Sequence, residues 1–313
     1  MIWPAACAAT LCALRCAVGM ASARAEVIAL YPVADTTLIQ AAPDNNNGAQ
    51  TFVNAGVTQN YTTNRGLFRF DIAAQIPPGS KITRAELKLE VVHQPKDGYT
   101  ASAFDLHRLL VPWGEGNKTN SSSASSPNPG LGEPATANEA TWNARFAFTT
   151  NLWTTPGGAA TNDFIPATSS SQFIYGTFNT PYIFDSTPLT VADVQMWLDN
   201  PGTNFGWLLQ SDDETANWTA CRFGSREDPQ NTAVLTVEYA PPEIDNAQMT
   251  GGQFNLSFTA QAGQAYAVEF RDSFSAVDVW STLTNFAAPP APSNIVVSDS
   301  VTNGRRFYRL RLP

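Results

Sequence analysis

Two arginines on one short alternating stretch are the first residues of this sequence that could do chemistry. The stretch NRGLFRFD (residues 64–71) changes side-chain type with period two. This period predicts a β-strand with Phe68 and Phe70 on the core face and Arg65 and Arg69 on the other. A guanidinium group can form two parallel hydrogen bonds with a carboxylate, so the two arginines could line a binding site for an acidic ligand, form a structural ion pair or face solvent.

A lysine on a second predicted strand extends this interpretation. AELKLEVV (residues 85–92) alternates in the same way and places Lys88 outward. If the two strands are neighbours, Arg65, Arg69 and Lys88 form one basic patch that a polyuronate chain would fit. Residues 61–118 hold eight of the 18 basic residues and six acidic ones, so this segment is locally positive. The alternative is ordinary surface ion pairing of the arginines with Asp71, Glu86 or Glu90.

Tryptophans surround a polar stretch at residues 114–140, which reads as a long surface loop. Sugars expose C–H faces that stack on aromatic rings, so Trp113 and Trp142 are candidate binding platforms. The alternative is that these two rings pack together and pin the ends of the loop.

Several turns carry hard oxygen donors. Calcium binds six to eight such oxygens, often from loops that are distant in sequence. The candidate calcium ligands are Asp35, Asp44, Asn47, Asp212 and Asp213. The alternative is turn chemistry, because Asp and Asn side chains cap turns without a metal.

Composition predicts the fold class. Charged residues make up only 14% of the 313-residue chain, and Gly and Pro number 20 and 22. Together with many short alternating segments, this predicts an all-β protein. We expect one helix in TVADVQMWLDNPG (residues 190–202), capped by Thr190, with Trp197 on its apolar stripe.

The N-terminus predicts secretion. Residues 1–25 are apolar, lack acids and end in Ala23-Arg24-Ala25, which is typical of a cleaved signal peptide; a membrane anchor is the alternative. Cleavage would remove three of four cysteines and leave Cys221 alone. Net charge would change from 18 − 27 = −9 to 16 − 27 = −11. Such acidity argues against nucleic acid or an anionic membrane as partner, and no later segment is apolar enough to span a bilayer.

The chain divides into two predicted domains. Residues 26–240 read as one domain of short strands, and residues 241–250 as a proline-marked linker. Residues 251–313 read as a smaller β-sandwich around Trp280, whose last strand places Arg309 and Arg311 on one face.

Several motifs, in order, resemble the disaggregatase-related (DNRLRE-type) modules, also grouped as carbohydrate-binding module family 96. They are Ala34-Asp35, Asn47-Gly48, the strand at 65–71, Ile76 to Gly79, Ala85 to Leu89, Trp113-Gly114-Glu115, Thr141-Trp142-Asn143, ADVQMWLDNPG and GWLLQSDDE. The resemblance covers nearly all of 33–239. The sequence departs from the family in lacking a tyrosine before Gly48 and in its longer loop between the two tryptophans. The C-terminal unit resembles small β-sandwiches appended to secreted bacterial proteins.

This resemblance implies a jelly-roll-like β-sandwich followed by a smaller Ig-like one, in an extracellular protein. Some members of the family bind acidic polysaccharides such as alginate. The sequence shows no Gly-x-Ser-x-Gly elbow and no paired histidines at metal-ligand spacing. We therefore predict a secreted, non-catalytic carbohydrate-binding protein with an optional structural calcium. The alternatives are a structural surface or matrix protein and a polysaccharide-degrading enzyme.

Overall fold

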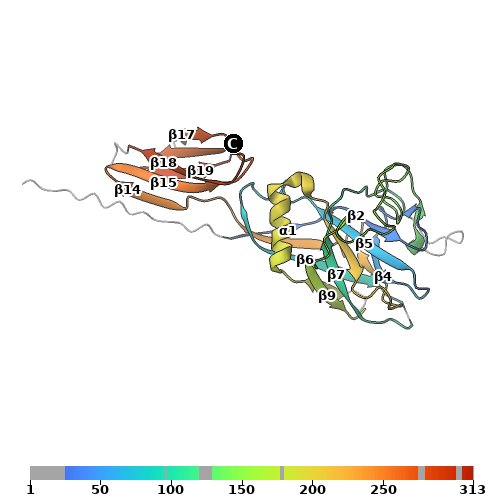
Figure 1. Cartoon of the computed structure of the whole chain (residues 1–313). Coiled ribbons are helices and arrows are strands. Elements are labelled where there is room, and N and C mark those ends of the chain that lie inside the picture. Colours follow the sequence, from blue (N-terminus) through green and yellow to red (C-terminus); the bar gives the residue numbers. More distant parts are fainter. Residues whose placement is uncertain are drawn as a thin grey trace, which may run out of the picture. The chain divides into compact units, whose positions relative to one another are not determined.

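The computed structural model describes residues 25–95, 97–119, 129–176, 180–273, 279–300 and 305–312. The chain divides into two compact units between Pro241 and Pro242 (Figure 1). The predicted linker at 241–250 is too long, because Asn246–Thr250 forms strand β14 of the second unit. The predicted signal peptide lies outside the described residues, apart from Ala25.

Antiparallel strands build the first unit. Eleven strands are connected by pairing. Nine of them follow one another in a single path, and the other two, β10 and β2, pair with β6 and β5 beside that path. In path order they are β1 (Glu26–Leu30), β13 (Val234–Ala240), β6 (Lys81–His93), β12 (Cys221–Gly224), β4 (Phe52–Val57), β5 (Thr63–Phe70), β11 (Trp207–Ser211), β7 (Ser102–Arg108) and β9 (Ser170–Ile174), with β10 (Thr180–Phe184) and β2 (Pro32–Ile39) as the branches.

The path curls at β4, which joins two sheets. Only Gly56 and Val57 of β4 pair with β5, whereas its other side pairs with β12 along four residues. One core cluster fills the space between the sheets and takes side chains from both, including Phe68 and Phe70 of β5 and Leu87 of β6. The predicted all-β sandwich class is therefore confirmed, and so is the core face of the arginine-bearing strand.

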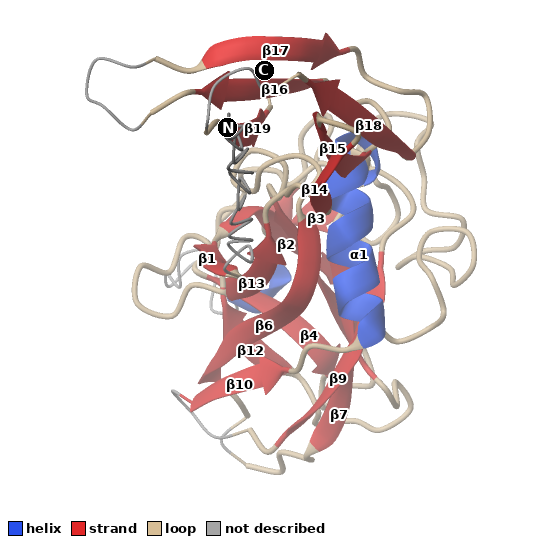
Figure 2. Ribbon diagram, turned by 90° about the vertical axis from the view of Figure 1, so that its left-hand side faces the viewer, coloured by secondary structure: helices blue, strands red, loops and turns tan. Residues whose placement is uncertain are grey.

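Helix α1 (Pro188–Asp199) packs beside β6 (Figure 2). Its Trp197 is fully buried as predicted, and the ring meets Trp207 edge-on at 4.5 Å between centroids. The predicted cap was wrong. Thr187 is the N-cap, because its hydroxyl accepts from the backbone N–H of Thr190 while the Thr190 hydroxyl accepts from the Thr187 N–H. A short 3-10 turn, η2 (Pro201–Thr203), follows the helix.

A second apolar cluster covers the outer face of the sheet that holds β5. Leu67 of β5 and Leu208 of β11 pack there against Trp113, Trp142, Trp153 and other side chains. These covering residues belong to a segment with little regular structure, residues 109–119 and 129–165, which we call the loop layer. It contains η1 (Pro129–Leu131) and the short strand β8 (Glu133–Pro134), which pairs with β3 (Asn45–Asn46).

The loop layer corrects the expectation of a surface loop at 114–140. In the described parts of this segment, Ala135, Glu139 and Ala140 are buried. The backbone N–H of Ala140 donates to the Gly114 carbonyl at 2.7 Å, and the Asn46 amide donates to the Ala140 carbonyl at 2.9 Å. The polar composition of the segment did not predict its burial. Its polar groups form hydrogen bonds with one another, and the tryptophans provide the apolar surface that is buried.

The second unit is a small sandwich of two three-stranded sheets around its own core cluster. One sheet is β14–β15–β18, with β15 at Gln253–Ala260 and β18 at Ser293–Asp299; the other is β17–β16–β19, at Ser281–Phe286, Tyr266–Arg271 and Phe307–Arg311. Tyr308 and Leu310 face this core as predicted. Trp280 does not, so its predicted place at the centre of the core was wrong.

None of the helices in the described ranges is long and apolar enough to cross a membrane.

Gly157→Ala should loosen the loop layer. Gly157 has φ +86°, and an added Cβ would lie 2.6 Å from the Trp142 ring. We expect a loss of about 1–3 kcal/mol of unfolding free energy from overpacking. Gly202→Ala is the matched control, because no atom lies within 4 Å of its added Cβ. Urea unfolding of the two variants measures the difference, and equal stabilities would contradict the close packing of the layer.

Candidate functional site

Arg65 is a structural clamp between the sheet and the loop layer. Its Nε and Nη2 atoms donate to Oε1 and Oε2 of Glu214 at 2.8 and 2.6 Å. Its Nη1 atom donates to the carbonyls of Gly157 and Gly158 at 2.8 and 3.0 Å. Only 14% of the side chain is exposed. The guanidinium group of Arg65 therefore donates its hydrogen bonds to acceptors within the protein.

Arg69 and Lys88 also lie in local contacts, and they do not form a patch with Arg65. The Arg69 guanidinium lies over the Trp113 ring at 5.7 Å. The Lys88 ammonium pairs with Glu90 at 2.9 Å. The sequence argument needed β5 and β6 to be neighbours, but β12 and β4 lie between them in the pairing path. The proposed adjacency was wrong, because β5 pairs with β2, β4 and β11 instead.

The alternative ion-pair scheme also named the wrong partners. Glu86 pairs with Arg84 on its own strand, and Asp71 accepts from the backbone N–H of Ala74 at 3.2 Å. Arg65 pairs with Glu214, which is 149 residues away in sequence. Arg65 is thus a structural residue, and only the fold brings its partner near.

The two predicted tryptophan platforms are buried. Trp113 and Trp142 are 3% and 8% exposed. Trp113 donates its indole N–H to the Phe205 carbonyl at 2.8 Å, and the Arg65 guanidinium lies 5.7 Å from the centre of the Trp142 ring. Both rings belong to the second apolar cluster, which favours a packing role for them over a role as sugar platforms.

Three of the candidate calcium ligands accept hydrogen bonds from other groups of the protein. Asp44 accepts from the Asn143 amide at 2.8 Å. Asp212 accepts from the Ser102 hydroxyl at 3.0 Å. Asp213 accepts from the backbone N–H and hydroxyl of Thr215, which lowers its pKa.

Asp35 and Asn47 are the two buried members of this set. Burial raises the pKa of Asp35 well above its usual value, although Asp35 accepts from the backbone N–H of Arg226 at 2.8 Å. The Asn47 amide is buried with no hydrogen-bond partner for either polar atom. Over the described residues, no three Asp, Glu, His or Cys side chains are arranged to hold a metal ion. The calcium hypothesis stays a prediction.

A pocket with a cavity volume of about 310 Å³ forms elsewhere, over strands β4 and β12. Its lining residues are Ile39, Ala41, Asn54, Thr58, Gln59, Asn64, His93, Pro95, Gly130, Leu131, Trp218, Ala220, Cys221 and Arg222. None of the five ligand-binding residues predicted from the sequence is among them.

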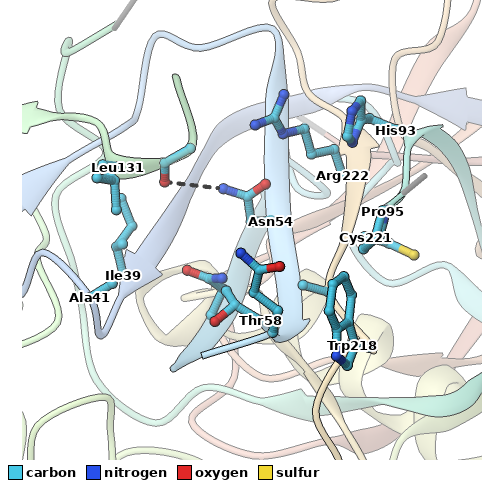
Figure 3. Close-up of a pocket in the computed structure, with 14 residues that line it drawn as sticks. Ile39, Ala41, Asn54, Thr58, His93, Pro95, Leu131, Trp218, Cys221 and Arg222 are labelled. Atoms are coloured by element: carbon cyan, nitrogen blue, oxygen red, sulfur yellow. Dashed lines mark hydrogen bonds between the residues drawn. The ribbon is translucent and has the colours of Figure 1, made fainter. Parts of the chain in front are cut away.

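One row of polar side chains crosses three strands in this pocket (Figure 3). Arg222 of β12 pairs in register with Asn54 of β4 and with His93 of β6. Directly opposed residues on antiparallel strands project to the same face. Val53 and Phe223, which adjoin Asn54 and Arg222, point the other way into the core. A register shift between Arg222 and Phe223 places His93, rather than Val92, opposite Arg222. The strand register therefore gathers an amide, a guanidinium and an imidazole.

Arg222 is the cation of this row. Its guanidinium lies 4.2 Å from the centre of the Phe52 ring. Within the described part of the chain, it has no hydrogen bond and no ion pair, which sets it apart from Arg65. Burial lowers the pKa of Arg222, although arginine stays charged at physiological pH. A half-buried charge without a carboxylate partner is costly, so it marks a place where an anion would be stabilised.

Two turns with strained backbone flank the pocket. Trp218 has φ +65° and Tyr61 has φ +58°, in the left-handed region that bulky residues rarely adopt. The turn of Trp218 is held by the Thr100 N–H, which donates to the Trp218 carbonyl, and by the Asn217 amide, which donates to the Gln59 carbonyl. The indole of Trp218 is half-buried and lines the pocket (Figure 3). Strain of this kind is often retained at binding sites.

The sequence contained a faint signal for Arg222. The stretch CRFG alternates a buried Cys221 and Phe223 with an outward arginine. The partners of that arginine lie 222 − 54 = 168 and 222 − 93 = 129 residues away, so only the strand order brings them together.

Comparison with protein-family models found no match to this chain, and comparison with curated proteins found none either. The resemblance to the DNRLRE-type modules therefore stays a prediction from the quoted motifs.

Arg65→Ala should destabilise the protein strongly. It leaves Glu214, which is 26% exposed, without its partner. We expect a loss of about 3 kcal/mol, the low end for breaking a buried ion pair. Arg84→Ala is the control, because Arg84 is 49% exposed in its pair with Glu86 and its loss should have a much smaller effect. Chemical unfolding compares them, and a small loss for Arg65→Ala would refute the clamp.

His107 should make stability depend on pH. Its Nδ1 lies 3.1 Å from the Ile165 carbonyl and its Nε2 lies 3.3 Å from the Gln210 amide, which fits a neutral ring. Burial lowers its pKa below 6.5 in the folded state. The unfolded chain then binds a proton that the folded chain does not, so the contribution of His107 is complete above pH 6.5 and is lost as pH falls below it.

The measurement is the difference in melting temperature between wild type and His107→Asn, taken from pH 7.5 to pH 5. The raised pKa values of Asp35 and Glu115 act with the opposite sign, but they cancel in this difference. We expect the advantage of the wild type to shrink as pH falls. A constant difference would show that His107 does not titrate differently on folding.

Proposed function

We propose that this protein is a secreted, non-catalytic carbohydrate-binding protein that holds an acidic polysaccharide at the pocket around Arg222. The observation that carries the proposal is the Arg222 guanidinium, which lines a polar pocket and has no carboxylate or other hydrogen-bonding partner among the described residues. A uronate carboxylate would supply the missing partner through two parallel hydrogen bonds.

The other lining side chains fit a saccharide. Asn54, Gln59 and Asn64 place amide groups around the pocket, and amides donate to and accept from sugar hydroxyls. Trp218 offers an aromatic surface for a sugar C–H face. This combination of an apolar surface and a few convergent polar groups is typical of ligand pockets.

Binding without hydrolysis is supported by the absence of carboxylates from the pocket. None of the described residues that line it is Asp or Glu. Glycoside hydrolysis generally uses two carboxyl groups, one on each side of the scissile bond. Secretion rests on the predicted signal peptide, and calcium binding on the acidic turns.

Two alternatives make different predictions. A structural surface protein would bind no saccharide, and its pocket would be incidental. A polysaccharide-degrading enzyme of the eliminating kind would use His93, opposite Arg222, to remove a proton beside the neutralised carboxylate. It would release unsaturated sugar ends.

Arg222→Gln should weaken binding of an alginate trisaccharide by about 10- to 150-fold, the range that corresponds to losing 1.5–3 kcal/mol from a charged hydrogen bond. Arg69→Gln is the matched control. It removes the same charge from a half-buried arginine that stacks on Trp113, outside the pocket. Titration calorimetry with the trisaccharide and with a neutral glucan trisaccharide measures the effect.

Three outcomes would contradict the proposal. A loss of affinity in Arg69→Gln but not in Arg222→Gln would show that the ligand binds at strand β5, as the sequence predicted. Absence of saccharide binding by the wild type would favour the structural alternative. Release of unsaturated products would favour the enzyme.

A further inference from the structure

A pair of arginines on the second unit shares one buried carboxylate. Arg309 of β19 lies opposite Glu269 of β16. Its Nη2 and Nε atoms reach Oε2 of Glu269 at 2.6 and 2.7 Å. Arg311 donates from Nε to Oε1 at 2.6 Å. Glu269 is 7% exposed and its pKa is lowered by Arg311 and Arg309, so it stays ionised and holds both guanidinium groups in place.

An indole ring extends this arrangement. The guanidinium of Arg309 lies over the Trp280 ring at 4.4 Å, and that of Arg271 lies over the same ring at 4.7 Å. We call these residues the arginine face: Arg271, Arg309 and Arg311 with Glu269 and Trp280. Ion pairs and ring contacts together fix the side chains, so a ligand would freeze few rotamers on binding.

The arginine face has guanidinium N–H donors and positive charge that its own carboxylate does not satisfy. Arg309 and Arg311 remain 44% and 42% exposed. The bonds above leave Nη1 of Arg309 and both Nη atoms of Arg311 without a partner in the described part of the chain. Arg309 and Arg311 together with Glu269 carry 2 − 1 = +1 charge, whereas the whole chain carries −9. One carboxylate therefore cannot neutralise both arginines.

We propose that the arginine face is a second binding site for the acidic polysaccharide, separate from the pocket around Arg222. The identity of the ligand rests on the proposed function; the site itself rests on the spare guanidinium donors. Arg309 and Arg311 are two residues apart on one strand, a distance of about 7 Å. This spacing suits acid groups on successive parts of an extended chain better than one isolated anion.

The chemistry of this face differs from that of the pocket. Guanidinium groups already lie over the Trp280 ring, so recognition here is by charge and paired hydrogen bonds rather than by stacking. Because these donors are exposed, whereas burial of the Arg222 guanidinium is greater, salt should weaken this site more than the pocket around Arg222.

Two sites in one chain imply binding by avidity. Each unit can hold a different stretch of the same polymer, and the second contact is then intramolecular. Linked sites of this kind raise the affinity for a long ligand by about 10²–10⁴ over either site alone. A trisaccharide can occupy only one site, so it should show no such gain.

The test uses the triple variant E269Q/R309Q/R311Q in the full chain. It removes the arginine pair without leaving a buried unpaired carboxylate, and it changes the net charge by −1. R305Q is the matched control, because Arg305 is exposed and has no hydrogen bond or ion pair with the described residues. This substitution also changes the net charge by −1. R309K/R311K keeps the charge and removes the paired donors. Melting temperatures show whether each variant is folded.

The measured quantities are the affinities for polymeric alginate and for an alginate trisaccharide. We expect the triple variant to lose about 10²-fold or more of its polymer affinity, R309K/R311K to lose less, and R305Q to match the wild type. Polymer affinity unchanged in the folded triple variant, or in R309K/R311K if the triple variant does not fold, would overturn the inference.

Failure of the proposed function gives a different pattern. If R222Q leaves trisaccharide binding unchanged while the triple variant loses polymer binding, the pocket is not the saccharide site and the arginine face is upheld. If the wild type binds no alginate of either length, both are overturned.

Discussion

Burial of β5 on both faces is the constraint on which the first unit depends. Its phenylalanines fill the core between the two sheets, and its outer face lies beneath the loop layer. An arginine in such a place must have all its donors satisfied, because an unpaired charge away from water is costly. Arg65 meets this requirement by bonding Glu214 and two carbonyls of the loop layer, which ties the layer to the sheet.

The requirement that a buried charge has a partner also helps to distinguish structural arginines from ligand-binding ones. Most described basic side chains of the first unit bond a carboxylate or a backbone oxygen close by, as Arg108 does with Asp193 of helix α1 at 2.8 Å. Arg222 and Arg69 do not: in the described part of the chain, each guanidinium group lies over an aromatic ring, that of Phe52 and that of Trp113. Of these two arginines, only Arg222 lines the pocket. We therefore assign the proposed ligand to the pocket over β12 rather than to the arginines of β5.

The two units use arginine in contrasting ways. In the first unit, a carboxylate is matched to a single guanidinium group, as Glu214 is to Arg65, and the pair is mostly buried. In the second, Glu269 is shared between two arginines that remain accessible. Sharing fixes the geometry of both guanidinium groups but neutralises only one charge, so donors remain available to a ligand.

Local pattern determined much of the fold. Period-two alternation placed Phe68, Phe70 and the apolar residues of β6 in the core, and the apolar stripe placed Trp197 beneath the helix. These are properties of side chains only a few residues apart, so the sequence by itself suffices. The strand order, the Glu214 partner of Arg65 and the row of Asn54, Arg222 and His93 were decided only by the tertiary structure. The Arg65–Glu214 pair and the contacts of Arg222 with Asn54 and His93 join residues more than 100 positions apart. No local periodicity encodes which strands will pair.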